Sequence, residues 1–408
     1  MELTKSKNSF YGPVPNDWIT CEFQDVLTGF SSGMTPYRGI PEYYRGNIPW
    51  ITSGELNYNI ITDTYEKITQ DAVIKTNLKV LPIGTFLMAI TGLEAAGTRG
   101  SCGISGVKAT TNQSCMALFP KEGKTDTKYL YHFYVKYGNE LAFKFCQGSK
   151  QQSYTGRIAK ILPINLPPTI TEQKAIATAL SDVDDLIANL DKLITKKKAI
   201  KQGAMQQLLT PTESWETKPL RELARYRRGS FPQPYGLAKW YDDISGMPFV
   251  QVVDVAKNNK LKVETKQRIS EEGAKMSVFV KKGTIILTIQ GSIGRICITQ
   301  YDAYVDRTLL IFESLLEDFN KYFFMVLVWL KFQIEKENAP GGIIKTITKE
   351  ALSSFEISYP NREEQDRISE ILSDMEEEIE ELKSKKEKYQ IIKQGMMQEL
   401  LTGKTRLV

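Results

Sequence analysis

Residues Thr171 to Thr210 read TEQKAIATALSDVDDLIANLDKLITKKKAIKQGAMQQLLT, and residues Glu363 to Thr402 read EEQDRISEILSDMEEEIEELKSKKEKYQIIKQGMMQELLT. Aligned without gaps at an offset of 192, the two stretches are identical at 18 of 40 positions. Helices that merely shared a composition would agree at far fewer positions, so the chain contains an internal duplication. The repeat consists of two long units, which predicts two similar halves.

The duplication extends into the segments that precede each of these stretches. Five further pairs keep the same order in both halves: Trp18 with Trp215, 47–51 with 246–250, 84–88 with 283–287, 128–131 with 321–324, and 148–149 with 341–342. Each half is therefore expected to be one globular domain followed by one long helix. The predicted boundaries are 1–168, 169–212, 213–360 and 361–408.

Both duplicated stretches have the apolar pattern of a coiled-coil helix, in which apolar positions alternate at spacings of four and three. These positions are Ile176, Leu180, Val183, Ile187, Leu190 and Ile194, then Ile368, Leu372, Met375, Ile379 and Leu382. The first helix leads into the second domain, and the second helix starts from it. If the two seams face each other within one molecule, the helices run antiparallel. An intermolecular coiled coil is the competing interpretation.

The globular domains are expected to be α+β, with a curved and mainly antiparallel sheet. Short β-rich runs that follow glycine predict strands, and aromatic segments of helical length predict helices. The strands are Thr85–Ile90 and Thr284–Ile289, and the helices are Tyr129–Phe145 and Phe319–Ile334. Gly- and Pro-rich stretches, Gly29–Pro49 and Gly229–Pro248, are expected to be irregular. The predicted fold is thus two pseudo-two-fold related domains joined by two long antiparallel coiled-coil helices.

Length and composition suit a soluble protein of two or three domains. Among 408 residues, 41% are hydrophobic and 25% charged, and a net charge of +5 permits nucleic-acid binding without arguing for it. The five cysteines show no C-x-x-C spacing, which favours a reducing cytosol. The first residues lack a signal-peptide pattern, and the longest apolar run, Tyr322 to Leu330, is too short to span a bilayer. We expect a cytoplasmic protein without membrane contact and interpret the apolar run as a buried helix.

Residue types that support catalysis are sparse. The single histidine, His132, lies in an aromatic helical pattern and is expected to be buried, and one histidine cannot supply a two-histidine metal site. Asp254 with Glu264-Thr265-Lys266 matches the acidic-x-Lys pattern of metal-dependent nucleases. The same pattern recurs at 381–383 and 126–128, as chance predicts in a charged chain. We therefore expect that the chain is not an enzyme and binds no metal.

The candidate binding residues combine small hydroxyls, aromatic rings and basic groups in the irregular stretches. Such side chains suit phosphate and base-edge contacts, with Arg reading guanine and Gln reading adenine. In the first half they are Ser31, Ser32, Thr35, Tyr37, Arg38, Tyr44, Arg45, Arg99, Lys150, Gln151 and Gln152. In the second half they are Arg227, Arg228, Ser230, Gln233, Tyr235, Lys239, Trp240, Tyr241, Arg295 and Lys345. Their matching placement in both halves favours binding over plain surface loops.

These features together resemble the specificity subunit of a type I restriction-modification system, over essentially the whole chain. The most specific marks lie in the helices: Glu172-Gln173 and Glu364-Gln365 near the starts, and I-K-Q-G-x-M-Q-x-L-L-T at 200–210 and 392–402. The first domain adds three marks: Gly33-x-Thr35-Pro36, Ile48-Pro49-Trp50-Ile51 and Thr111-Asn112-Gln113. In the second domain Phe249 replaces the Trp, and Val305-Asp306-Arg307 replaces the last mark. Such divergence is expected if the halves read different sequences.

The resemblance implies that each domain reads one half of a split, asymmetric site in double-stranded DNA. The helices would set the gap between half-sites and dock two methyltransferase subunits, which modify adenine with S-adenosylmethionine. Restriction subunits that use ATP and magnesium would join this core, and the present chain would bind none of these cofactors. Half-sites on one face of B-DNA are centred about 34 Å apart. A helix of about 38 residues is roughly 57 Å long and could act as the spacer.

Two functions of other classes stay open from the residues alone. One is a structural scaffold whose helices assemble partner proteins without reading DNA, which weak, sequence-independent DNA affinity would favour. The other is a divergent nuclease, which would require metal-dependent cleavage that Glu264→Ala abolishes.

Overall fold

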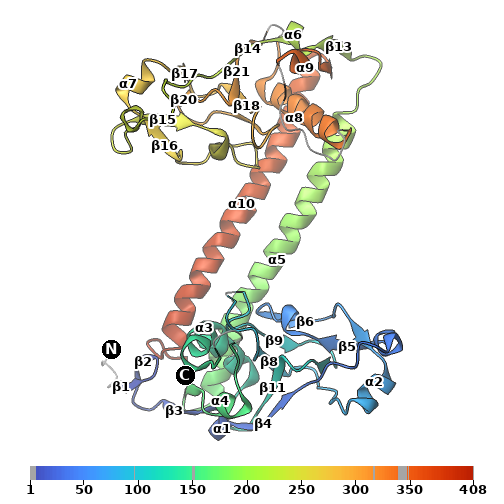
Figure 1. The fold of residues 1–408 in the computed structure, drawn as a ribbon, viewed down its shortest axis with the longest axis vertical. Coiled ribbons are helices and arrows are strands. Elements are labelled where there is room, and N and C mark those ends of the chain that lie inside the picture. The colour runs from blue at the N-terminus through green and yellow to red at the C-terminus, as the bar shows by residue number, and fades with distance from the viewer. Residues whose placement is uncertain are drawn as a thin grey trace. The chain divides into compact units, whose positions relative to one another are not determined.

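The computed structural model describes residues 6–95, 97–148, 152–315, 318–338, 347 and 349–407. These fall into two compact units: unit 1 comprises Met1–Leu193 with Leu382–Val408, and unit 2 comprises Ile194–Glu381. Each unit combines β-sheets with a shorter helix and with part of both long helices, α5 (Ile170–Leu208) and α10 (Arg362–Leu400), as Figure 1 shows. The predicted α+β class with long helices is confirmed.

The main sheet of unit 1 has five strands in the order β4-β11-β8-β9-β6. Its strands are β4 (Leu27–Ser32), β11 (Cys115–Pro120), β8 (Phe86–Ala89), β9 (Cys102–Ser105) and β6 (Asn59–Ile61). All neighbours are antiparallel except the parallel pair β6 and β9. Helix α3 (Thr127–Phe145) packs on β8 and β9. The predicted strand and helix of this domain therefore correspond to β8 and α3.

A smaller sheet of unit 1 has the order β10-β5-β7. Its strands are β10 (Thr110–Thr111), β5 (Ile48–Ile51) and β7 (Lys67–Ile68), with β5 parallel to β10 and antiparallel to β7. Two further pairs, β1 (Ser6–Ser9) with β2 (Gly12–Pro15) and β3 (Ile19–Glu22) with β12 (Pro163–Leu166), are antiparallel.

Unit 2 repeats the order of the first four strands in the main sheet of unit 1, without a counterpart of β6, and its smaller sheet has four strands where that of unit 1 has three. Its main sheet has the order β14-β21-β18-β19, formed by β14 (Ala224–Arg228), β21 (Leu309–Leu315), β18 (Ile285–Thr288) and β19 (Ile296–Ile298). The smaller sheet has the order β16-β15-β20-β17, formed by Gln267–Ile269, Met247–Val250, Ala303–Val305 and Val278–Val280. Strand β13 (Glu216–Pro219) pairs with β22 (Glu356–Tyr359), and α8 (Lys321–Asn338) packs on β19. The predicted duplication of the domains is confirmed at the level of strand order.

Burial explains why the apolar runs form these elements. The four residues of β8 are all fully buried, which fits a short continuous apolar run rather than an alternating one. The run 322–330 lies in α8, and most of its side chains belong to the core of unit 2, as predicted. Within the described residues, no helix has the length and apolar composition needed to cross a membrane.

Inside unit 1, the first part of α5 runs antiparallel to the last part of α10. Asp184 pairs with Lys393 at 2.5 Å and Asp191 pairs with Lys386 at 2.6 Å, so partners advance in opposite directions. The seam residues Ile176 and Leu180 are completely buried. The pairing expected within one chain is therefore present in this unit.

Inside unit 2, the last part of α5 and the first part of α10 pair in the same antiparallel sense. Lys197 lies 2.6 Å from Glu378, and Lys201 lies 3.0 Å from Glu376. Ile368 and Leu372 are buried in the core of this unit.

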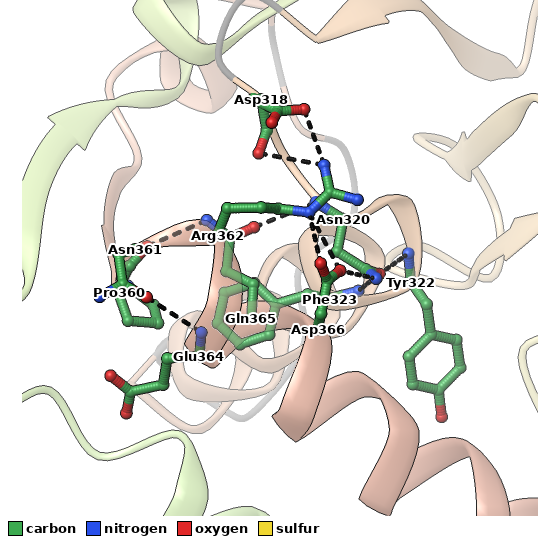
Figure 2. A network of polar contacts seen from close by, with 10 residues as sticks. All are labelled: Asp318, Asn320, Tyr322, Phe323, Pro360, Asn361, Arg362, Glu364, Gln365 and Asp366. Atoms are coloured by element: carbon green, nitrogen blue, oxygen red, sulfur yellow. Dashed lines mark hydrogen bonds and ion pairs between the residues drawn. The ribbon is translucent and has the colours of Figure 1, made fainter.

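A buried glutamine joins each long helix to the shorter helix of its unit. The side-chain carbonyl of Gln365 accepts from the backbone amide of Asn320 at 3.1 Å (Figure 2). The side-chain amino group of Gln365 donates to the backbone carbonyl of Pro360 at 3.0 Å. In unit 1 the Gln173 carbonyl accepts from the Asp126 amide at 2.9 Å. Asn320 and Asp126 cap the first turns of α8 and α3. The glutamine of the Glu-Gln pair near the start of each long helix therefore anchors that helix to the domain that precedes it.

Candidate nucleic-acid interface

In unit 1, three segments that are distant in sequence form one cluster. Strands β5 and β10 pair in parallel, with Trp50 opposite Thr110. The Trp50 indole nitrogen donates to the Met34 carbonyl at 3.1 Å, and the Gly33 amide donates to the Asn112 carbonyl at 3.2 Å. The three marks quoted from the first domain thus meet at one place. We call this arrangement the three-segment cluster, formed in unit 1 by residues 33–36, 48–51 and 110–113.

Unit 2 forms the same cluster from residues 229–232, 247–250 and 304–307. Phe249 lies opposite Tyr304 in the parallel pair of β15 and β20. The Ser230 amide donates to the Val305 carbonyl at 3.0 Å, and the Asp306 amide donates to the Val250 carbonyl at 3.0 Å. The two predicted replacements, Phe for Trp and Val-Asp-Arg for Thr-Asn-Gln, therefore occupy equivalent positions.

Glycine is required where the first segment crosses the third. A Cβ atom on Gly33 would lie 1.7 Å from the Thr111 carbonyl oxygen, and one on Gly229 would lie 2.3 Å from the Val305 carbonyl oxygen. Both partners are backbone atoms that cannot move aside. This contact explains the glycine of the Gly-x-Thr-Pro mark, and it fixes the loop that follows against the sheet.

The loop of unit 1 carries an arginine whose charge is already paired. Arg38 donates from its two terminal nitrogens to Glu66 at 2.5 and 2.8 Å, and its guanidinium carbon lies 4.2 Å from the Tyr44 ring centre. The Arg38 hydrogen bond lowers the pKa of Glu66, while burial raises the pKa of Tyr44. Tyr37 is 73% exposed, and Arg45 is also exposed.

Two predicted residues of this loop belong to a strand. Ser31 and Ser32 end β4, where they pair with β11, because the strand continues four residues into the stretch expected to be irregular. Thr35 donates its hydroxyl hydrogen to the Gln113 side-chain carbonyl at 2.6 Å. Gln113 belongs to the Thr-Asn-Gln mark and is not among the predicted binding residues. Its contact with Thr35 places it beside the loop.

The loop of unit 2 combines exposed and buried predicted residues. Tyr235 is 60% exposed, with its ring centre 4.2 Å from that of Phe231, and Gln233 is exposed. Trp240 is only 3% exposed and donates its indole hydrogen to the Pro234 carbonyl at 2.8 Å. Trp240 is therefore a core residue of the loop rather than a surface contact.

Around Trp240, the remaining groups are held by local partners. Lys239 pairs with Glu272 at 2.8 Å and lies 4.1 Å from the Trp240 ring centre. Tyr241 is half-buried, which raises its pKa. Ser230 donates to the Met276 carbonyl at 3.1 Å.

Arg227 and Arg228 end strand β14 rather than lying on a loop. Both are exposed, and Arg227 has Glu313 at 4.0 Å. They occupy in unit 2 the strand position that the two serines of β4 occupy in unit 1.

The arginines of the second predicted loop have a common structural contact. Arg99 donates to the Leu93 and Glu94 carbonyls at 2.9 and 3.0 Å. Arg295 donates to the Val255 carbonyl at 3.0 Å. Arg99 therefore braces its own loop, whereas Arg295 ties its loop to a segment 40 positions earlier in the chain.

The third predicted loop is described only in part. Gln152 is half-buried, and its backbone amide donates to a Glu94 carboxylate oxygen at 2.9 Å. Lys150, Gln151 and Lys345 lie outside the described residues.

The acidic residue considered for a nuclease has a backbone role. Asp254 is fully buried, and its two carboxylate oxygens accept from the Gln251 and Lys266 amides, each at 2.8 Å. Glu55 of unit 1 accepts in the same way from the Thr52 and Tyr65 amides. A carboxylate that recurs as a turn brace in both units has a structural explanation. Across the part of the chain that is described, no three His, Cys, Asp or Glu side chains gather in a metal-binding group.

Comparison with known families decides the relationship. The model of a type I restriction modification DNA specificity domain matches residues 15–202 and again 212–390. The chain belongs to this specificity family. The resemblance to type I specificity subunits that the sequence motifs indicated is thereby confirmed. The prediction of a non-catalytic subunit is confirmed with it, since similar proteins are named specificity subunits.

Relatives in the specificity family span the whole chain or one half of it. The putative type I restriction enzyme MjaX specificity subunit of Methanocaldococcus jannaschii is 25% identical over 427 residues, 98% of this chain and 96% of the relative. The MjaIX specificity subunit of the same organism is 33% identical over 192 residues, 46% of this chain and 43% of the relative.

Solved structures show the same fold. The S subunit of a type I restriction-modification system from M. genitalium superposes with a TM-score of 0.63 at 14% identity, covering 94% of this chain and 96% of that one. A chain from a structure on complex assembly and conformational transition of the type I R-M system has a TM-score of 0.57 at 14% identity, covering 96% and 99%.

Proposed function

We propose that this protein is the sequence-reading subunit of a type I restriction-modification complex. Each unit reads one half of a bipartite, asymmetric site in double-stranded DNA. The long helices set the gap between the half-sites and dock two methyltransferase subunits, and restriction subunits join that core. S-adenosylmethionine, ATP and magnesium belong to those partners.

The observation that carries this proposal is the pair of three-segment clusters. Their backbones share the hydrogen bond from the first segment to the Thr111 or Val305 carbonyl, the hydrogen bond from the third segment to the Ile51 or Val250 carbonyl, and the close approach at Gly33 and Gly229. The side chains on the loops differ: Tyr37 and Arg38 in unit 1 are replaced by Gln233 and Pro234 in unit 2. A shared frame with different exposed donors and rings is what two readers of different half-sites require.

The helices offer a surface for partner subunits beside their own seam. Leu186, Leu193 and Ile200 recur every seven residues of α5 and remain 45, 38 and 45% exposed. A heptad stripe of exposed apolar side chains suits a partner helix. We assign this stripe to the methyltransferase subunits.

Selection from randomised duplexes tests the proposed function. The full chain would be co-purified with its methyltransferase partner, and the DNA it retains would be sequenced. The expected result is two short constant blocks separated by a fixed variable gap. An intact complex that enriches no sequence would contradict the proposal and favour the scaffold.

Single substitutions then assign the two blocks to the two units. Arg38→Ala or Arg45→Ala should change or weaken selection of one block only, and Arg228→Ala or Lys239→Ala the other. A base-specific contact contributes about 1–3 kcal/mol. Equal losses at both blocks would contradict the assignment of one block to each unit.

A further inference from the structure

We infer that Gln113 in unit 1 and Arg307 in unit 2 bind the DNA backbone, each donating hydrogen bonds to a phosphate of the half-site that its unit reads. This inference rests on the proposed function and adds two residues that do not belong to the predicted binding set. It also separates their task, holding the duplex, from the task of reading bases.

Both residues stand at the apex of a turn that is built in the same way. The Asn112 side-chain oxygen accepts from the Ser114 amide at 3.0 Å, and the Asp306 side-chain oxygen accepts from the Thr308 amide at 2.9 Å. Each turn begins within the third segment of a three-segment cluster and ends one residue beyond it. Gln113 and Arg307 lie between these bonded residues and are both exposed.

The turns are anchored to the smaller sheets. The Asn112 amide donates to the Ile51 carbonyl at 2.9 Å, and the Asp306 amide donates to the Val250 carbonyl at 3.0 Å. Asp306 is itself only 4% exposed. An exposed side chain on so fixed a backbone loses less conformational entropy when it orders against a ligand.

The chemistry that both apex residues offer is hydrogen-bond donation. The Gln113 carbonyl already accepts from Thr35 at 2.6 Å, and within the described residues its side-chain amino group has no acceptor. Arg307 carries five N–H donors and no acceptor. Its guanidinium carbon lies 6.0 Å from the Tyr235 ring centre, which steadies the group beside the loop.

A phosphate explains this common feature better than a base. Glutamine reads adenine by presenting its carbonyl and its amino group together, whereas the Thr35 hydroxyl already takes one of the two acceptor positions of the Gln113 side-chain carbonyl. The loops around the two turns differ, as two different half-sites require, but the donor at the apex is retained. Two half-sites of different sequence have only their sugar-phosphate backbone in common.

Salt-dependent binding tests the inference on two probes, the selected duplex and a random-sequence duplex of equal length. In the complex with the methyltransferase partner, Arg307→Ala should bind both probes about tenfold more weakly at low salt. The slope of log affinity against log salt should shrink by about 0.9, because one phosphate contact by a cation is lost. Arg307→Gln should lose the same slope but less affinity.

Unit 1 supplies the complementary variants. Gln113→Ala should weaken binding to both probes by the same factor with an unchanged slope, since the lost group is neutral. Gln113→Arg should steepen the slope by about 0.9. Neither variant should change the sequence that is selected.

Arg221→Ala is the matched control, because Arg221 is exposed in α6 (Leu220–Leu223), at the opposite end of β14 and β21 from the turn. It should bind like the wild type. Variants of the apex residues that bind both probes normally would overturn the inference, as would a changed base preference. If the wild type binds the selected and the random-sequence duplex equally well, the proposed function is wrong. A loss of affinity for the random-sequence duplex in the apex variants would still support a phosphate contact in that case.

Discussion

Within the protein itself, the guanidinium group of Arg38 already has partners at its edge and on one face. Glu66 accepts from both terminal nitrogens, and the Tyr44 ring covers the face. Guanine recognition uses a similar pair of donors. In the proposed complex, Glu66 would therefore compete with DNA for Arg38 and restrain it from binding any phosphate that comes near.

Removing that restraint should loosen specificity. In Glu66→Ala, affinity for a random-sequence duplex should rise, the salt slope should steepen by up to about 0.9, and discrimination of the selected duplex should fall. Folding stability should change by less than about 1 kcal/mol, because both side chains are more than a third exposed. Glu42→Ala removes the same charge from an exposed neighbouring position and is the control. Equal discrimination by both variants would show that Glu66 does not restrain Arg38.

His132 gives unit 1 a specific sensitivity to acid. It is 1% exposed, its Nε2 lies 2.9 Å from the Ser181 hydroxyl, and burial, aided by Lys393 and Lys128, lowers its pKa to about 3. The unfolded chain takes up this proton near the ordinary pKa of 6.5, whereas the folded chain does not. Stability is therefore unaffected above that pH and is lost as the pH falls from 6.5 toward 3.

At pH 5 the cost should reach about 2 kcal/mol. Denaturant unfolding of wild type and His132→Gln at pH 7.5 and pH 5 measures it, since the chain has no other histidine. The variant should lose less stability than the wild type over this interval. Identical losses would mean that His132 takes up its proton in the folded state.

Single residues are also where sequence reasoning reached its limit. Arg295 was predicted to bind DNA, but it donates to the carbonyl of Val255, 40 positions earlier. Gln113 depends in the same way on Thr35, 78 positions away. Side-chain partners at such separations are created by the fold, so composition and local pattern could not identify them. Trp240 was misassigned because an exposed and a buried aromatic look alike within a short Pro-rich loop.

At the scale of elements, the buried glutamines explain how a helix and a domain are joined. The Gln365 side chain bonds the backbone amide of Asn320, which directly precedes α8, and the carbonyl of Pro360, which lies two residues before α10. Around it, the exposed Arg362 bonds Asp318 and Asp366 (Figure 2). Solvent screens these outer pairs, so the buried amide should dominate the stability of the junction.

Gln365→Ala should lower the stability of unit 2 by about 1–3 kcal/mol, since two buried backbone groups lose their partner. Amide exchange should accelerate at Asn320 and in the first turn of α10. The exposed neighbour Glu363 provides the control, because Glu363→Ala should change stability by no more than about 0.5 kcal/mol. Unchanged exchange at Asn320 in Gln365→Ala would contradict this role for the amide.

Elements were predicted well where one period or one run decides them. The four-three spacing identified α5 and α10, which begin one residue after the predicted starts and end four and eight residues before the predicted ends. The apolar runs after glycine identified β8 and β18. The strands β10 and β20 are two and three residues long, and the pairing that creates them comes from distant segments. Strands of this length carry no periodic signal of their own.

At the scale of the whole molecule, the duplication could be recognised in the sequence because helix seams and sheet cores tolerate few changes of residue type. The strand order of each unit could not be predicted, since it depends on which apolar runs pair with one another. Each unit includes part of both long helices, so unit 1 is made of two separate stretches of the chain and unit 2 of the single stretch between them. The proposed spacing function belongs to this scale, since it depends on the length of both helices together.

Lengthening both helices by one heptad should therefore change the gap and nothing else. The insertions would be placed between Leu193 and Ile194 and between Glu381 and Leu382, where the units divide. Seven residues add about 10.5 Å, or roughly three base pairs of B-DNA, and keep the seam in phase. Selection should return the same two blocks with a gap about three base pairs longer. An insertion in α5 alone shifts one seam against the other and should destabilise the pair instead, and an unchanged gap in the double insertion would show that the helices do not set the spacing.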